Sequence, residues 1–434
     1  MIDKIKEILF NSKGIDGWKI NESKIEASEL FFIKKELDMN RAKEVHHFKV
    51  TVYKDFEEDG VMYKGSSSTN IYPTMSDEEI KKAIESAAFA ASFVKNKYYP
   101  LVRPSEVAIS NIESGFSKAS ISEWLPKVTE AIFSSDKYDK GSINSSEIFL
   151  EKVYTRIINS EGVDVSYDGY KGQIEMITNW KEDGEEIELY KDVKFADFDK
   201  EDIVKCVENM LKMSKDKAIA KSTPVLKNIP VLLSGEPVKE FFNYYYDQAN
   251  AQLVYEGIST AKVGECVQGK EIKGDKVNIT VDPLLKGSTL SAPYDEDGYP
   301  LKAVDIYIDG VLKGYWGNNR FSHYLNIEPT GNIRNIIVHE GCQSVDSLKS
   351  EPYLELVAFS DFQMDTMTGD FAGEIRLGWY FDGKNITPVT AGSISGNIKD
   401  VQQDMYFSKE IQQLNNFKGP KTIKLQNVSI AGNE

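Results

Sequence analysis

Apolar residues recur at intervals of three and four in several segments of the chain, which is the period of a helix that buries one face. Helices are predicted on this basis over residues 2–9, 76–94, 122–133, 200–217 and 238–252. Ser76 and Glu79 have the spacing of a capping box, so the second of these helices is predicted to begin at Ser76.

Between these helices, short runs of β-branched and aromatic residues are separated by polar turns, a pattern typical of strands. Strands are predicted between residues 24 and 72, and a β meander is predicted over residues 146–195. After residue 252, short strands alternate with Gly and Asn turns. Regular spacing of short strands favours a closed or sandwiched antiparallel sheet.

The strand and helix patterns change around residues 220–230, which contain Pro224 and Pro230 and few large apolar side chains. A chain of 434 residues exceeds one ordinary hydrophobic core. We therefore predict two domains, residues 1–222 and 223–434. The predicted fold class is α+β. It combines an N-terminal α/β domain, with an antiparallel sheet and helices, and a C-terminal, mainly antiparallel β domain of barrel or sandwich type.

Residues 282–334 form the most distinctive stretch of the second half. Lys302 to Asp309 largely alternates apolar with polar residues, and Asp309-Gly310 separates this run from the next one. An Asp-Gly pair between two such runs is a strong hairpin signal. The stretch is predicted to be a rigid β scaffold that carries charged loops, among them Asp295-Glu296-Asp297-Gly298.

Composition limits the function. The net charge is −16, and no cluster of Lys and Arg offsets it, so direct binding to nucleic acid is not expected. The longest run of small apolar residues, 87–94, is too short to cross a bilayer, and the N-terminus lacks a signal peptide's apolar core. Three scattered cysteines, Cys206, Cys266 and Cys342, indicate reduced thiols and a cytoplasmic location.

Several short motifs also occur in a fixed order along the chain. They are Asn159-Ser160-Glu161-Gly162, Asp282-Pro283, Pro293-Tyr294-Asp295-Glu296-Asp297-Gly298, Leu312-Lys313-Gly314-Tyr315, Thr330-Gly331-Asn332 with Arg334, Thr368-Gly369-Asp370-Phe371, and Gly392 to Asn397. This order resembles the TldD/PmbA family, also called modulator of DNA gyrase, over most of the chain. The resemblance implies a relation to cytoplasmic metallopeptidases that act on small or unfolded peptides, in peptide maturation and antitoxin turnover.

The resemblance also raises the question of a metal site. The active subunit of that family carries H-E-x-x-x-H on the helix after the domain boundary, with a Cys near the C-terminus, and binds zinc. Here the corresponding helix reads VKEFFNYYYDQ over 238–248, no histidine lies between His47 and His323, and no Cys or His follows Cys342. Glu240 and Asp247 alone make a poor zinc site. The chain therefore resembles the PmbA-like (TldE-like) members, which lack the zinc ligands. No cofactor and no metal are expected in it.

The resemblance implies a dimer with a TldD-like catalytic subunit, or with a second copy of this chain, and a peptide substrate without membrane contact. An extended peptide is predicted to add as a strand to sheet edges of the second domain. The candidates for the peptide groove are Tyr244, Tyr245, Asp247, Trp316 and Arg320. The residues of the family's loop motifs are Asp295, Asp297, Arg334 and Asp370.

Three alternatives stay open from the sequence. In the first, the tyrosines and Trp316 pack within the protein instead of lining a peptide groove, and this interpretation is preferred for them. The 295–298 loop could instead supply carboxylates to a free-standing hydrolase, because only their separation in space decides such chemistry. The chain could also be a homodimeric peptide-binding protein with no catalytic partner.

Overall fold

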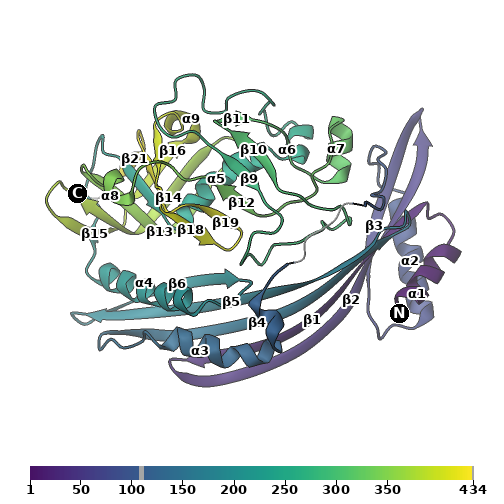
Figure 1. Cartoon of the computed structure of the whole chain (residues 1–434), viewed down its shortest axis with the longest axis horizontal. Helices are drawn as coiled ribbons and strands as arrows, with labels where there is room; N and C mark the ends of the chain where they lie inside the picture. Colours follow the sequence, from purple (N-terminus) through teal and green to yellow (C-terminus); the bar gives the residue numbers. More distant parts are fainter. Residues whose placement is uncertain (107–111, 433–434) are drawn as a thin grey trace.

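The computed structural model describes residues 1–106 and 112–432 (Figure 1). The N-terminal half consists of α1 (Ile2–Asn11), β1 (Gly17–Ile33), β2 (Glu36–Glu58), β3 (Val61–Ile71), α2 (Asp77–Ala91), η1 (Gly115–Lys118), η2 (Ile121–Trp124), α3 (Leu125–Phe133), β4 (Gly141–Asn159), β5 (Asp164–Glu182), β6 (Glu185–Phe195) and α4 (Lys200–Ala218). Its six strands form one antiparallel sheet in the order β3-β2-β1-β4-β5-β6. In Figure 1 this sheet is long and curved, and the C-terminal half lies on one side of it.

Helices cover the two ends of this sheet through separate apolar clusters. At one end, Ile5 of α1 and Ile84 of α2 pack with Phe48 and Val50 of the sheet. At the other end, α3 and α4 pack against β4 and β5. Along β5, every second residue from Gly172 to Trp180 is buried, as expected of a strand with one covered face. The sheet therefore has two small cores rather than one.

The predicted capping box at the start of α2 is present. The Ser76 hydroxyl accepts the Glu79 N–H, and the Glu79 carboxylate accepts the Ser76 N–H at 2.8 Å. Replacing Ser76 with alanine is expected to lower the free energy of unfolding by about 1 kcal/mol, because one helix N–H loses its acceptor. Urea unfolding measures this loss. Ser76→Asp, which keeps an acceptor, is the control, and an equal loss in both variants would contradict the capping role.

The C-terminal half consists of β7 (Lys221–Ser222), β8 (Val231–Ser234), α5 (Glu236–Gln248), α6 (Ala251–Tyr255), β9 (Ile279–Val281), β10 (Val304–Ile308), β11 (Val311–Leu312), α7 (Asn319–Leu325), β12 (Ile336–Val338), α8 (Val345–Leu348), β13 (Tyr353–Met364), β14 (Asp370–Phe381), β15 (Ile386–Thr390), β16 (Ser393–Asn397), α9 (Ile398–Val401), β17 (Met405–Phe407), β18 (Ile411–Leu414), β19 (Phe417–Pro420), β20 (Thr422–Leu425) and β21 (Ser429–Ala431). One sheet has the order β11-β10-β9-β12-β19-β18, and a second has the order β17-β20-β8-β13-β14-β15-β7, with β16 and β21 joined through β14. Both contribute to one large core. The predicted α+β class is confirmed.

Helix α5 lies between these two sheets and connects their apolar faces. Phe241 contacts Phe371 of β14, with ring centroids 5.8 Å apart. Phe242 contacts Phe407 and also Phe417 of β19, at 5.3 and 6.2 Å. The inner face of α5 is therefore filled by aromatic rings.

The structure corrects three details of the predicted architecture. The helix expected over 238–252 is two helices, since the Asn250 side chain accepts the N–H groups of Gln252 and Leu253 and begins α6 anew. The C-terminal sheets also contain three parallel pairs, β8 with β13, β12 with β19 and β7 with β15. The N-terminal strands extend well beyond the predicted apolar runs. Within the described residues, no helix is both long enough and apolar enough to span a membrane.

Candidate functional site

The loop at residues 295–298 joins the two halves of the chain. Lys19 on β1 forms an ion pair with Asp297, and the two side chains are 12% and 25% exposed. The Asn21 amide donates to the Glu296 carbonyl at 2.9 Å. At Gly298, with φ +80°, a Cβ would lie 2.6 Å from Val163 in the turn between β4 and β5. Glycine is thus required there both for its conformation and for the close approach.

Asp295 organises this loop from inside. Its carboxylate is buried and accepts the N–H groups of Asp297 and Tyr299, each at 2.9 Å. Burial beside Asp297 and Glu296 raises the pKa of Asp295 to about 7, although the two backbone N–H groups act in the opposite direction. Burial opposes the charge of Lys19, but the three acidic side chains of the loop outweigh it and raise the pKa of Lys19.

The raised pKa of Asp295 predicts a pH-dependent stability. Below about pH 4, the ordinary pKa of Asp, the carboxyl is protonated in both the folded and the unfolded state. Between about pH 4 and pH 7 it is protonated only in the folded state. Folding therefore loses about 2.5 kcal/mol at this group as the pH rises from about 5 to about 8. In Asp295→Asn this loss is expected to disappear.

Urea unfolding of both proteins at the two pH values measures this difference. Lys19, Glu296 and Asp297 are present in both proteins, so the comparison isolates the changed side chain. A variant that kept the full pH dependence of the unaltered chain would show that another group causes it.

Helix α7 makes a second contact between the halves, and Arg320 belongs to it. Its guanidinium donates to the Asn96 side chain at 2.8 Å and lies over the Tyr99 ring. Its neighbour Asn319 donates to the Pro100 carbonyl at 2.6 Å. The structure thus places Arg320 at the contact between the halves.

The remaining groove candidates gather at the C-terminal end of α5. Tyr245 is fully buried and donates to the Gln402 side chain at 3.1 Å. Trp316 is buried, and its indole N–H donates to the Tyr246 carbonyl at 2.8 Å. The indole also stacks on the Tyr246 ring, with the ring centroids 4.2 Å apart. Tyr244 is half-buried and packs edge-on against Tyr245. Asp247 is also half-buried, and burial raises its pKa. Most of these side chains are engaged in packing.

Asp370 and Arg334 lie in exposed positions. Arg334 comes two residues after Asn332, whose backbone N–H donates to the Asp295 carboxylate at 3.4 Å. The Asp370 carboxylate accepts hydrogen bonds from Asn397 and Thr368, at 2.8 and 2.9 Å, which lower the pKa of Asp370. The Arg334 carbonyl accepts the Asn416 amide at 2.8 Å. Asp295 and Asp297 therefore share one loop, the corner that contains Arg334 contacts this loop through Asn332, and Asp370 is held within its own turn.

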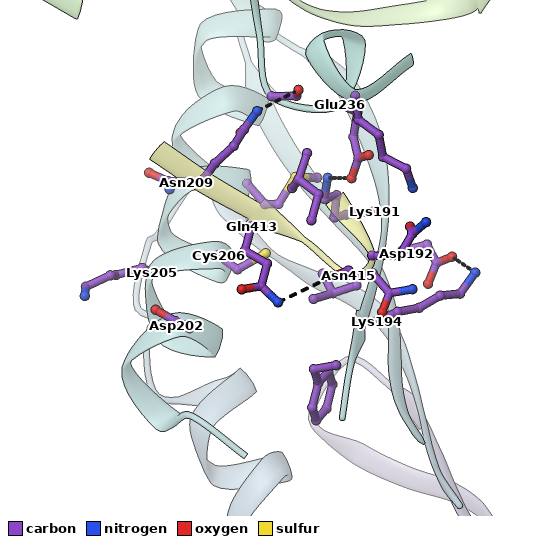
Figure 2. A pocket seen from close by; sticks show the side chains of 18 of the residues that line it. Lys191, Asp192, Lys194, Asp202, Lys205, Cys206, Asn209, Glu236, Gln413 and Asn415 are labelled. Atoms are coloured by element: carbon purple, nitrogen blue, oxygen red, sulfur yellow. Dashed lines mark hydrogen bonds and ion pairs between the residues drawn. The ribbon is translucent and has the colours of Figure 1, made fainter. Parts of the chain in front are cut away.

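A cleft of about 2600 Å³ separates the N-terminal sheet from the C-terminal half. One wall is formed by β6 and α4. The other is formed by the start of α5, the 284–290 loop, β13 and β18. Figure 2 shows Lys191 of β6 and Glu236 of α5 meeting across it, with their charged atoms 3.0 Å apart. Lys and Arg side chains are about as numerous as Asp and Glu along its lining, in contrast to the acidic chain as a whole.

None of the groove or loop-motif residues singled out from the sequence lines this cleft. Sequence reasoning missed its walls, because β6 and β18 are far apart in the chain and each has an ordinary strand pattern. Nowhere in residues 1–106 and 112–432 do three or more His, Cys, Asp or Glu side chains gather as a metal ion would require.

The long curved sheet, the aromatic helix between two further sheets and the cleft between the halves define a two-part α+β protein. Residues 226–432 match the family model described as PmbA/TldA metallopeptidase C-terminal domain. The C-terminal half of the chain therefore has the C-terminal domain of the TldD/PmbA family, as the order of its motifs indicated.

Three relatives illustrate the similarity. An uncharacterized protein of Methanocaldococcus jannaschii is 26% identical over 64% of this chain and 67% of that protein. A metalloprotease PmbA homolog of Buchnera aphidicola is 24% identical over 47% of this chain, and the match covers only 46% of that protein. The crystal structure of TldE from Thermococcus kodakarensis has a TM-score of 0.80 at 17% identity, covering 98% of this chain and 99% of that one.

Proposed function

We propose that this chain is the PmbA/TldE-like, non-catalytic subunit of a cytoplasmic zinc metallopeptidase that acts on small or unfolded peptides. In this proposal the chain pairs with a TldD-like subunit that carries the zinc. Similarity to a metalloprotease PmbA homolog and to TldE supports it, although the matched PmbA sequence is covered only in part.

The observation that carries the proposal is the composition of α5. A zinc-binding helix presents imidazole or thiolate groups on one face, and a metal-bound water needs a neighbouring base. The inner face of α5 presents Phe241, Phe242 and Tyr245 to the core instead. At the cleft, Lys239 and Glu240 take the accessible positions. The donor set of this helix does not suit zinc, so hydrolysis is assigned to the partner.

The 295–298 loop supports a structural role more than a hydrolytic one. The Asp295 carboxylate accepts hydrogen bonds from backbone N–H groups of the loop. Asp297 forms an ion pair with Lys19, and Glu296 accepts a hydrogen bond from Asn332. Each carboxylate therefore already has a partner, and the ion pair of Asp297 with Lys19 fixes the loop on the N-terminal sheet.

The test is to purify the chain alone and together with an H-E-x-x-x-H relative from the same organism. We expect a stable complex that contains zinc and cleaves an unfolded peptide such as reduced, carboxymethylated α-lactalbumin. The isolated chain is expected to contain little zinc and to cleave nothing. Stoichiometric zinc or cleavage in the isolated chain would overturn the proposal. Self-association without binding to the relative would favour a homodimeric peptide-binding protein.

A further inference from the structure

Strand β6 is an edge of the N-terminal sheet, and its free side borders the cleft. It pairs with β5 in one continuous antiparallel register, so the backbone groups of successive residues point alternately toward β5 and away from it. The Leu189 carbonyl accepts the Thr178 hydroxyl of β5 and so points inward. The Glu188 carbonyl instead accepts the Arg376 side chain of β14, and so points outward.

One backbone hydrogen bond already crosses from the end of β6 to the C-terminal half. The Ala196 N–H donates to the Gly287 carbonyl at 2.8 Å. Because the direction alternates along the strand, the N–H and C=O groups of Tyr190, Asp192 and Lys194 also point outward, away from β5, as those of Glu188 and Ala196 do. No described residue takes up these outward groups of the three central residues. The outward groups are thus occupied at both ends of this edge, by a backbone hydrogen bond at Ala196 and by the Arg376 side chain at Glu188, while the middle stays open.

One side-chain oxygen on the same strand also lacks a partner. One carboxylate oxygen of Asp192 is buried without a hydrogen bond from any described residue, while its other oxygen lies 3.0 Å from Lys194. A buried polar atom is costly unless it is hydrogen-bonded. An N–H or ammonium group of a molecule in the cleft would satisfy it.

The facing wall offers apolar and polar contacts for such a molecule. Strand β18 is also a sheet edge, and its Ile411 is 50% exposed, as Tyr190 on β6 is 58% exposed. Gln413 and Asn415 line the same space near Lys194, as Figure 2 shows. The balanced charges of the lining select for neither a strongly acidic nor a strongly basic molecule.

We propose that the cleft binds an extended peptide segment, which adds to the free edge of β6 as an antiparallel or parallel strand along Tyr190, Asp192 and Lys194. This proposal rests on the proposed function in taking a peptide as the ligand. It differs from the sequence-based prediction by placing the pairing edge in the N-terminal half. Main-chain hydrogen bonds supply the affinity in this mode, and the side chains of the walls supply the selectivity.

The first test uses the backbone of the peptide. The open edge from Tyr190 to Lys194 would pair with about five residues at about 3.3 Å each, so a fluorescein-labelled peptide of about ten residues rich in threonine, valine and serine is long enough as the probe. Methylation of every second amide blocks the N–H groups on one edge of the extended probe and leaves those on the other edge free. The Kd of this probe is expected to stay within about threefold of that of the unmethylated probe. Methylation of all amides is expected to weaken binding at least about tenfold. Equal binding of the fully methylated probe would overturn strand addition.

The second test uses the edge itself. Lys194→Pro removes one outward N–H without breaking the β5 ladder, since proline is tolerated on the free side of an edge strand. It is expected to weaken probe binding about tenfold, whereas Lys194→Ala, which keeps the N–H, is expected to bind within about twofold. Circular dichroism checks the fold of each variant. If the proline variant does not fold, the methylated probes still decide the question.

The outcomes separate this inference from the proposed function. A probe that binds regardless of its amides and of Lys194→Pro overturns strand addition but leaves peptide binding standing. If the probe does not bind and Lys194→Pro converts a dimer into a monomer by light scattering, the edge is a subunit interface and the inference is overturned. Cleavage by the complex with the zinc-bearing relative tests the proposed function independently.

Discussion

Replacing Phe242 with alanine is expected to lower the free energy of unfolding by about 4 kcal/mol. The ring is fully buried and contacts four aromatic rings, those of Phe241, Tyr245, Phe407 and Phe417. Its removal leaves a cavity between two sheets that surround it on both sides and cannot both move inward. Urea unfolding followed by tryptophan fluorescence measures the loss.

Asn243→Ala is the matched control for Phe242. Asn243 is next to it on α5, is half-buried and bonds to Glu240 at 3.0 Å. Its replacement is expected to cost less than about 1 kcal/mol. Similar losses in the two variants would contradict the central position of Phe242 in the core.

The second large effect is expected at the contact between the halves. Lys19→Met should lower the free energy of unfolding by about 3 kcal/mol, because it leaves Asp297 without its partner in a half-buried site beside two other acids. Urea unfolding measures the total loss. Limited proteolysis should also become faster in the 295–298 loop.

Lys24→Met on the same strand is the control for Lys19. Lys24 is 51% exposed and lies 3.3 Å from Glu22. Glu22 is 7% exposed but keeps the His46 side chain as a partner at 2.9 Å, so the loss of the exposed Lys24 is expected to cost less than about 1 kcal/mol. If both methionine variants were equally stable, the contact between Lys19 and Asp297 would not hold the halves together.

Local signals in the sequence predicted several elements correctly. The Ser76 capping box begins α2, and Asp309-Gly310 forms the tight turn between β10 and β11 with φ values of 53° and 76°. Both features depend on residues a few positions apart, whose chemistry is visible in the sequence. The α+β class and the family resemblance were also predicted correctly.

Strand lengths could not be predicted in the same way. Residues 36–45 of β2 are all exposed, yet they pair with β1 in a ladder that is interrupted by one register shift between Leu37 and Met39. Backbone hydrogen bonds hold these residues in a strand. Their sequence shows no alternation of apolar and polar residues from which the strand could have been predicted. The end of α5 was missed because Asn250 acts as a cap only when the chain turns at Ala249.

The candidate site shows the same limit over longer distances. Asp295 and Asp297 were singled out from the sequence, but Lys19 was not, and 278 positions separate Lys19 from Asp297. The cleft depends on two sheet edges whose residues are typical of strands, and only the folded chain brings β6 and β18 to one space. Sequence reasoning can propose such residues but not their neighbours.

The strand order also affects how the protein is made on the ribosome. Strand β4, which pairs with β1 along most of its length, begins at Gly141, more than a hundred residues after β1 ends at Ile33. At a synthesis rate of about 5–20 residues per second, the newly made β1 waits roughly 5–20 s for this neighbour. During that interval Leu30, Phe31 and Phe32 lie on an uncovered ribbon that can pair with other nascent chains. The yield of native protein in cells should therefore depend on chaperones that bind this early segment.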